Sequence, residues 1–174
     1  MNQDEQFMSQ ALREAEKALR AGEVPCGCVV VKAGRIIARG WNQVEKLKDA
    51  TAHAEMIALT AAEAALGDWR LEGCTVYVTK EPCPMCAGAL VHCRPERVVY
   101  GMPDPKGGAC GGWINLLDSN PPLNHRCPTQ GGVLHELCAE QFCSFFREAR
   151  RAAKERRVER SGLNEERHEE SSAD

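Results

Sequence analysis

Short β-branched segments alternate with Ala- and Leu-rich segments along this chain, and that alternation constrains the fold more than any other feature of the sequence. The segments typical of buried strands span residues 26–31, 35–41, 74–79, 97–101 and, weakened by Pro128, 123–130. The segments typical of helices span residues 4–21, 52–66, 83–93 and 133–158. After the hairpin of the first two strands, strands and helices alternate. We therefore expect an α/β sheet covered by helices, with parallel strands in its second half.

The chain has 174 residues, a length that suits one domain with tails. It contains ten cysteines. The N-terminal residues are charged and amphipathic and contain no apolar leader segment. No stretch approaches the roughly 18 apolar residues that a membrane span requires, so no membrane association is expected. These features predict a cytoplasmic protein with reduced thiols, most of them small buried residues and a subset able to bind metal.

The C-terminal part of the sequence changes its charge abruptly. Residues 147–160 carry seven Lys or Arg and three Asp or Glu, and residues 161–174 carry five acidic residues and one Arg, within an overall charge of −3. The basic stretch has two interpretations, a nucleic-acid contact or a salt-bridged surface helix. The sequence predicts one domain over residues 1–160 and a disordered acidic tail over residues 161–174, which lacks apolar periodicity.

Two short motifs place metal-binding side chains at the starts of helices that follow strands. The first is Thr51-Ala52-His53-Ala54-Glu55, and the second is Glu81-Pro82-Cys83-Pro84-Met85-Cys86. The two cysteines are three residues apart, so both thiols can reach one Zn²⁺ from the first turn of a helix. His53 would add a nitrogen ligand. Three protein ligands leave the fourth tetrahedral position open, as in catalytic rather than structural zinc sites.

Glu55 is the candidate proton carrier of this site. A residue two positions along a helix is rotated by about 200°, so the carboxylate need not share the metal with His53. It can then exchange protons with a water and with a leaving amine. The competing possibility is a closed structural site with a fourth ligand, for which His92, Cys93 and Cys110 are nearest in sequence.

The order H-x-E followed by P-C-x-x-C is the signature of zinc-dependent nucleobase deaminases. Beyond it, the sequence resembles the bacterial tRNA-specific adenosine deaminases of the cytidine-deaminase-like superfamily over roughly residues 5–157. Further segments that carry the resemblance are Gly22-Glu23-Val24-Pro25, Gly40-Trp41-Asn42, Val99-Tyr100-Gly101, Asp104-Pro105-Lys106-Gly107, Asn124-His125-Arg126 and Phe145-Phe146-Arg147. Lys80, Pro103 and Gly112 depart from the usual residues of the family.

The resemblance implies a three-layer α/β/α sandwich with a five-stranded mixed sheet, a homodimer and one Zn²⁺ per subunit. It implies hydrolytic conversion of the wobble adenosine (position 34) of an arginine tRNA to inosine, on an anticodon stem-loop as partner. The metal ligands would be His53, Cys83 and Cys86, with Glu55 as the proton shuttle. The substrate-binding residues would be Asn42, Asp104, Lys106, Phe145, Arg147 and Arg150.

Two other functions remain open at this point. A deaminase of a free nucleobase or nucleoside, such as guanine, cytosine or cytidine, would use the same metal chemistry. A zinc module without catalytic activity, serving as a scaffold, would have no need of Glu55. Turn chemistry alone would also explain Asn42, Asp104 and Lys106, and core packing would explain Phe145.

Overall fold

The computed structural model describes the backbone of residues 1–171 and the side chains of residues 1–157. Met1–Phe142 form one compact unit, and the chain from Cys143 onward forms a second, which is described by itself. The elements follow in the order α1 (Gln3–Arg20), β1 (Gly27–Lys32), β2 (Arg35–Trp41), α2 (Val44–Leu47), α3 (Ala54–Leu66), β3 (Cys74–Lys80), α4 (Pro84–Cys93), β4 (Arg97–Met102), β5 (Thr129–Gln130) and α5 (His135–Ser171).

The five strands form one mixed sheet in the order β2-β1-β3-β4-β5. β1 pairs antiparallel with β2 and β3, whereas β3, β4 and β5 are parallel. Because β3 and β4 run in the same direction, the loops that follow them emerge at the same edge of the sheet. This arrangement confirms the predicted α/β architecture with parallel strands in its second half.

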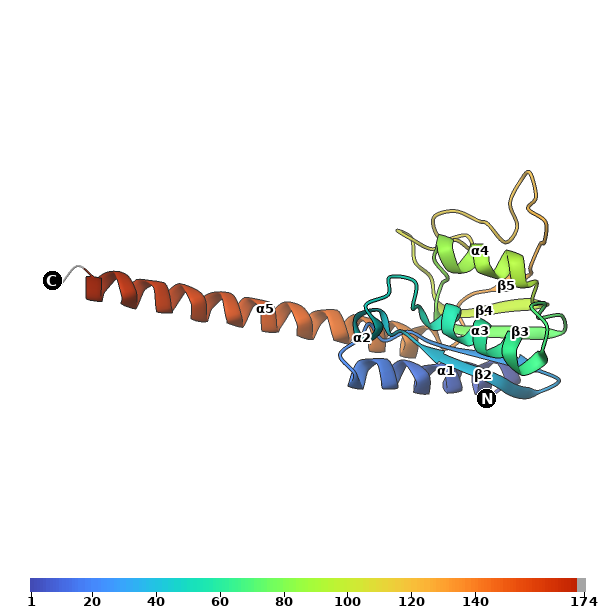
Figure 1. The fold of residues 1–174 in the computed structure, drawn as a ribbon, viewed down its shortest axis with the longest axis horizontal. Helices are drawn as coiled ribbons and strands as arrows, with labels where there is room; N and C mark the ends of the chain where they lie inside the picture. The colour runs from blue at the N-terminus through green and yellow to red at the C-terminus, as the bar shows by residue number, and fades with distance from the viewer. Residues whose placement is uncertain (172–174) are drawn as a thin grey trace. The chain divides into compact units, whose positions relative to one another are not determined.

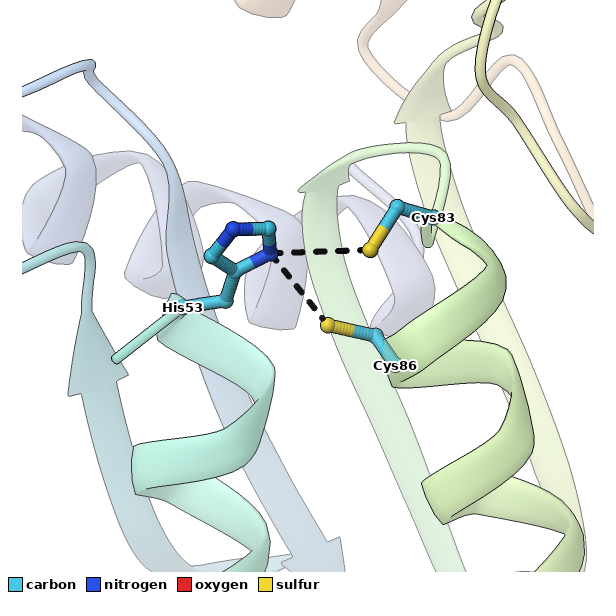
Figure 2. Close-up of side chains that lie close together, drawn as sticks. All are labelled: His53, Cys83 and Cys86. Carbon is cyan, nitrogen blue, oxygen red and sulfur yellow. Dashed lines mark hydrogen bonds between the residues drawn. The ribbon is translucent and has the colours of Figure 1, made fainter. Parts of the chain in front are cut away.

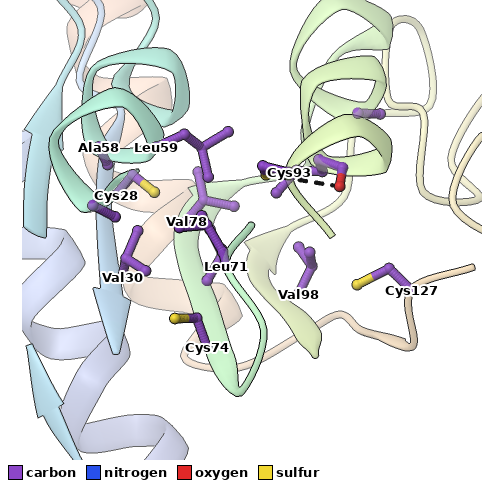
Figure 3. Packing of buried hydrophobic residues seen from close by; sticks show 14 of the residues in the cluster. Cys28, Val30, Ala58, Leu59, Leu71, Cys74, Val78, Cys93, Val98 and Cys127 are labelled. Carbon is purple, nitrogen blue, oxygen red and sulfur yellow. Dashed lines mark hydrogen bonds between the residues drawn. The ribbon is translucent and has the colours of Figure 1, made fainter. Parts of the chain in front are cut away.

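Helices cover both faces of the sheet, which gives the expected three layers (Figure 1). Alternate residues of each strand face opposite sides, so Val30 packs with the α3 and α4 side and Val29 packs with α1. The core between the sheet and α3 and α4 includes five cysteine side chains among valines and leucines, namely those of Cys28, Cys74, Cys93, Cys110 and Cys127, all but Cys110 labelled in Figure 3. All ten thiols of the chain are free, and seven are buried.

Three local differences from the sequence prediction have physical reasons. The predicted loop at 42–51 contains α2, a single turn too short to show periodicity. The predicted strand at 123–130 pairs only at Thr129–Gln130, because Pro128 has no N–H to donate to a ladder. The backbone of α5 stays helical to Ser171, past residue 161, since Glu, Arg and Leu favour helix even without apolar periodicity.

Residues 172–174 of the predicted tail lie outside the described part of the chain, and the boundary at residue 160 stays a prediction. Within α5, the cations of the basic stretch are exposed up to residue 157, where the description of side chains ends, and Arg151 Nε lies 3.8 Å from Glu155 Oε1 across one helical turn. Exposed pairs of this kind contribute little to stability. Among the described residues, no helix is long and apolar enough to cross a membrane.

Candidate metal centre

The candidate ligands occupy the cap positions of two helices. His53 is the N-cap of α3 and Cys83 is the N-cap of α4, both with extended backbone angles. Pro84 is the first residue of α4, where its missing N–H has no consequence, and Cys86 is the third. Cys83 therefore precedes the first helical turn rather than lying within it. An N-cap side chain turns toward the third residue of its helix, which brings the two sulfurs together.

The three donor atoms are spaced as a tetrahedral zinc ion requires (Figure 2). His53 Nδ1 lies 3.6 Å from Cys83 Sγ and 3.5 Å from Cys86 Sγ, and all three donors lie within 4.8 Å of one another. Zn–N and Zn–S bonds of about 2.1 and 2.3 Å at the tetrahedral angle place nitrogen and sulfur about 3.6 Å apart. The two nitrogen–sulfur distances thus match those of one bound zinc ion.

Cys83 differs from Cys86 and from the thiols of the core in its ionisation. The pKa of Cys83 is lowered to about 3, because its sulfur accepts a hydrogen bond from Cys86 and another from His53. The pKa of Cys86 is raised, because it donates to Cys83 and is buried. In contrast, burial raises the pKa of Cys93 to about 12 and that of Cys127 to about 11. Cys83 is therefore a thiolate that can bind a cation, whereas the core thiols stay protonated.

The metal group contains three residues in the part of the chain whose side chains are described. His53, Cys83 and Cys86 form the group that could hold an ion there, and no fourth His, Cys, Asp or Glu joins it. Cys93 and Cys110 are buried in the core, and His92 is exposed. The arrangement corresponds to an open three-ligand site, the form that zinc takes in catalytic centres.

Glu55 is the second residue of α3 and is 5% exposed. Burial raises the pKa of this carboxyl group above its usual value, although backbone hydrogen bonding at the helix start and the nearby His53 act in the opposite direction. The side chain also interacts with Cys86, which places it beside the metal group. A buried carboxyl group with a raised pKa next to an open metal position is suited both to accept and to return a proton.

Asn42 follows β2 and is buried. Its Nδ2 donates to Glu23 Oε2 at 3.2 Å, and Glu23 also accepts hydrogen bonds from the backbone N–H groups of Glu45 at 3.2 Å and Lys46 at 2.6 Å. A carboxylate only accepts hydrogen bonds, so Asn42 must turn its NH₂ group toward Glu23. Its carbonyl oxygen then accepts no hydrogen bond from the described residues and is available to a ligand.

Asp104 and Lys106 lie in the loop after β4. The Asp104 carboxylate accepts hydrogen bonds from Lys80 Nζ and from the backbone N–H groups of Lys106 at 3.0 Å and Gly107 at 3.2 Å. Burial alone would raise the pKa of Asp104, but these donors lower it below the ordinary value. Asp104 thus shapes its own loop, and the Lys106 side chain is exposed to solvent.

The remaining predicted contact residues lie on α5, in the second unit. Phe145 is partly buried and meets Phe146 edge to face at 5.2 Å, whereas Arg147 and Arg150 are exposed. Their contribution to substrate binding stays a prediction. The sequence reasoning missed two buried carboxylates, Glu23 and Glu81, each of which accepts three hydrogen bonds from residues further along the chain. A glutamate at the end of an apolar strand was the available signal for Glu81.

Comparisons with known proteins agree with this geometry. Residues 1–102 match the family described as the cytidine and deoxycytidylate deaminase zinc-binding region. The tRNA-specific adenosine deaminase of Bacillus subtilis is 50% identical over 165 residues, which cover 95% of this chain and 100% of that protein.

Two solved structures resemble the chain over much of its length. A structure from work on A-to-I editing by tRNA:A34 deaminases is 42% identical, with a TM-score of 0.75 over 78% of this chain and 98% of that one. The guanine deaminase of Bacillus subtilis is 43% identical, with a TM-score of 0.56 over 59% of this chain and 66% of that one. The chain therefore belongs to the tRNA-specific adenosine deaminase family, within the zinc-binding cytidine and deoxycytidylate deaminases.

Proposed function

We propose that this protein is a zinc-dependent hydrolase that converts the wobble adenosine (position 34) of an arginine tRNA to inosine. The observation that carries the proposal is the open group of His53, Cys83 and Cys86, spaced for zinc and flanked by the buried Glu55. The similarity to tRNA-specific adenosine deaminases over nearly the whole chain supports the choice of substrate.

The reaction replaces the exocyclic amine of adenine with an oxygen from water. Zinc held by the three ligands would supply a Lewis acid that makes this water more acidic. Glu55 takes a proton from the water, delivers it to N1 of the base, and then transfers a second proton to the amine, which leaves as ammonia. One water is consumed and one ammonia is released. The raised pKa of Glu55 suits both roles, since the group must be ionised to accept a proton and neutral to donate one.

The base reaches this site from a single-stranded loop. Bases of an anticodon loop can be turned outward at modest cost, unlike those of a duplex. Asn42 would then accept a hydrogen bond from the base through its free carbonyl oxygen. Lys106, Arg147 and Arg150 are exposed cations that would bind the phosphate backbone, and Phe145 would offer its ring for packing.

We also propose that the protein is a homodimer in the cytoplasm. The family resemblance supports the dimer, which size-exclusion chromatography with light scattering would test. Ten free thiols, seven of them buried, suit a reducing compartment.

The substrate experiment compares an anticodon stem-loop carrying A at the wobble position, the same stem-loop carrying G, and free adenosine, guanine and cytidine. We expect ammonia release only from the first. Release from free guanine or cytidine, with the A stem-loop left unchanged, would transfer the assignment to a free-base or nucleoside deaminase. Guanine is included because of the similarity to a guanine deaminase.

A variant of Glu55 tests whether the site is catalytic. Glu55→Gln should lower kcat by about 10²- to 10⁴-fold, the usual contribution of a proton-transferring side chain, while zinc content stays at one per chain. Glu63→Gln on the same helix α3 is the matched control and should keep full activity. Loss of zinc in the Glu55 variant would instead make this carboxylate a structural part of the metal site.

A further inference from the structure

The loop at residues 103–112 closes around the side chain of Glu81. This glutamate follows β3, is 2% exposed, and accepts three backbone hydrogen bonds from the loop. Its Oε2 accepts from Asp104 N at 2.8 Å, and its Oε1 accepts from Cys110 N at 2.9 Å and from Gly112 N at 2.8 Å. One carboxylate thus holds the beginning and the end of the 103–112 loop.

The backbone around Glu81 extends the same connection. Glu81 N donates to Met102 O at 2.8 Å, and Ala109 N donates to Pro82 O at 2.8 Å. Glu81 and Pro82 directly precede the candidate ligand Cys83. The 103–112 loop is therefore hydrogen-bonded to the segment that delivers a metal ligand, and its position is defined relative to the metal group.

Two glycines of the loop fit closely against the carboxylate. A Cβ added at Gly108 would lie 2.3 Å from Glu81 Cδ, and one added at Gly112 would lie 2.3 Å from Glu81 Oε2. A Cβ at Gly107 would meet only the Asp104 side chain, at 3.3 Å. The loop backbone thus needs glycine at the two positions that contact Glu81, whereas a Cβ at Gly107 would press only on the end of the Asp104 side chain.

The buried carboxylate interacts with the loop through these three hydrogen bonds. None of the ion pairs among the described residues includes Glu81. A buried carboxylate is costly unless hydrogen bonds replace its water, and three N–H groups do so here. Removing the carboxylate would leave the three N–H groups, of which that of Cys110 is buried, without this acceptor, so the position of the loop depends on it.

We propose that Glu81 is a positioning residue for RNA binding, which fixes the 103–112 loop so that Lys106 meets the anticodon backbone beside the metal group. This inference rests on the proposed function. Because the loop binds the substrate before and during the reaction alike, loosening it should weaken binding without slowing the chemical step. The expected signature is therefore a rise in KM for the stem-loop at nearly constant kcat.

Glu81→Gln is the test variant, because it keeps the size of the side chain and turns one acceptor oxygen into an NH₂ group that opposes a backbone N–H. We expect KM for the A stem-loop to rise about tenfold or more, as for the loss of a hydrogen bond to a charged group, with kcat changed less than about threefold. Zinc content should stay unchanged. Glu96→Gln is the matched control, since Glu96 is exposed at the other end of the sheet.

Hydrogen exchange measures the anchoring without any substrate. In the Glu81→Gln protein, the amides of Asp104, Cys110 and Gly112 should exchange about tenfold faster or more, while exchange in α1 stays the same. A second variant approaches the contact from the loop. Gly112→Ala should raise KM as Glu81→Gln does.

Unchanged KM and unchanged exchange in Glu81→Gln would overturn the inference. A loss of zinc, or a fall in kcat at constant KM, would overturn it as well, because Glu81 would then serve the metal site. If the wild-type protein releases no ammonia from any stem-loop, the proposed function is refuted, and the role of Glu81 in RNA binding is refuted with it. In that case the exchange of the three amides would still report whether Glu81 anchors the loop.

Discussion

Gly40 is the position at which a single methyl group should damage the metal centre from outside it. This glycine lies in β2, buried against the start of α3. A Cβ at residue 40 would lie 2.3 Å from Ala54 O and 2.7 Å from Ala58 N, both backbone atoms of that helix. Ala54 stands between His53 and Glu55. The substitution Gly40→Ala therefore pushes directly on the helix start that carries the candidate ligand His53 and the candidate proton carrier Glu55.

The size of the effect follows from the contact distances. A separation of 2.3 Å is about 1 Å short of the 3.4 Å at which ordinary contact begins, so α3 or β2 must move by about 1 Å. Overpacking of this kind costs about 1–3 kcal/mol, which corresponds to a fall in Tm of about 2–12 °C for a chain of this size. A shift of about 1 Å at catalytic groups costs on the order of 100-fold in rate.

The assay compares Gly40→Ala with Gly27→Ala. A Cβ at Gly27 would lie 2.0 Å from Ala11 O and 2.4 Å from Ala15 N of α1, a helix that carries none of the candidate site residues. Both variants should lose thermal stability. At a temperature where both are folded, only Gly40→Ala should lose about 100-fold in kcat/KM and bind zinc more weakly. Equal kcat/KM in the two variants would refute the claim that the packing of α3 on β2 sets the site geometry.

Three further changes concern metal binding, alkaline stability and the charge of the substrate loop. Cys86→Ala should abolish zinc binding, whereas Cys28→Ala in the core should lower only the stability of the fold. The measurement is the zinc content of each purified variant, and zinc retained in Cys86→Ala would contradict the ligand assignment. Burial, followed by the hydrogen bond that Tyr77 donates to a carboxylate, raises the pKa of Tyr77 from 10.0 to about 12. The protonated Tyr77 hydroxyl adds its full stability below pH 10, and this stability is lost as the pH rises to about 12. Tyr77→Phe should therefore make the free energy of unfolding fall less steeply with pH across this range. An unchanged slope of that free energy against pH would contradict the assignment. Lys80→Leu should raise the pKa of Asp104, because the ammonium group that bonds its carboxylate is removed; an unchanged NMR titration of that carboxyl carbon would count against the pair.

The main elements could be predicted because their signals are local. Three consecutive valines at residues 29–31 form β1, and the Ala-rich segment 54–66 forms α3, each within two residues of its expected ends. The order of motifs likewise placed His53 and the two cysteines at helix starts. These features depend on residues that are close in sequence, so hydrophobic periodicity and capping rules are enough to predict them.

The features that could not be predicted depend on contacts between distant parts of the chain. Glu81 bonds to residues 23 to 31 positions further on, and Glu23 bonds to residues 19 to 23 positions further on. Neither pairing leaves a periodic trace in the sequence. The charged part of α5 shows the opposite case, because its backbone continues as helix to Ser171, past the expected end at residue 158, and helix propensity is a local property.

The spacing of the two helix caps has a consequence for stability. His53 and Cys83 are 30 residues apart in the chain, so an ion held between them closes a covalent-like loop of that length. A cross-link of this size removes about 3–4 kcal/mol of chain entropy from the unfolded ensemble. A chelator should then abolish the activity and also destabilise the packing of α3 with α4. Metal supply would set the lifetime of the folded protein together with its turnover.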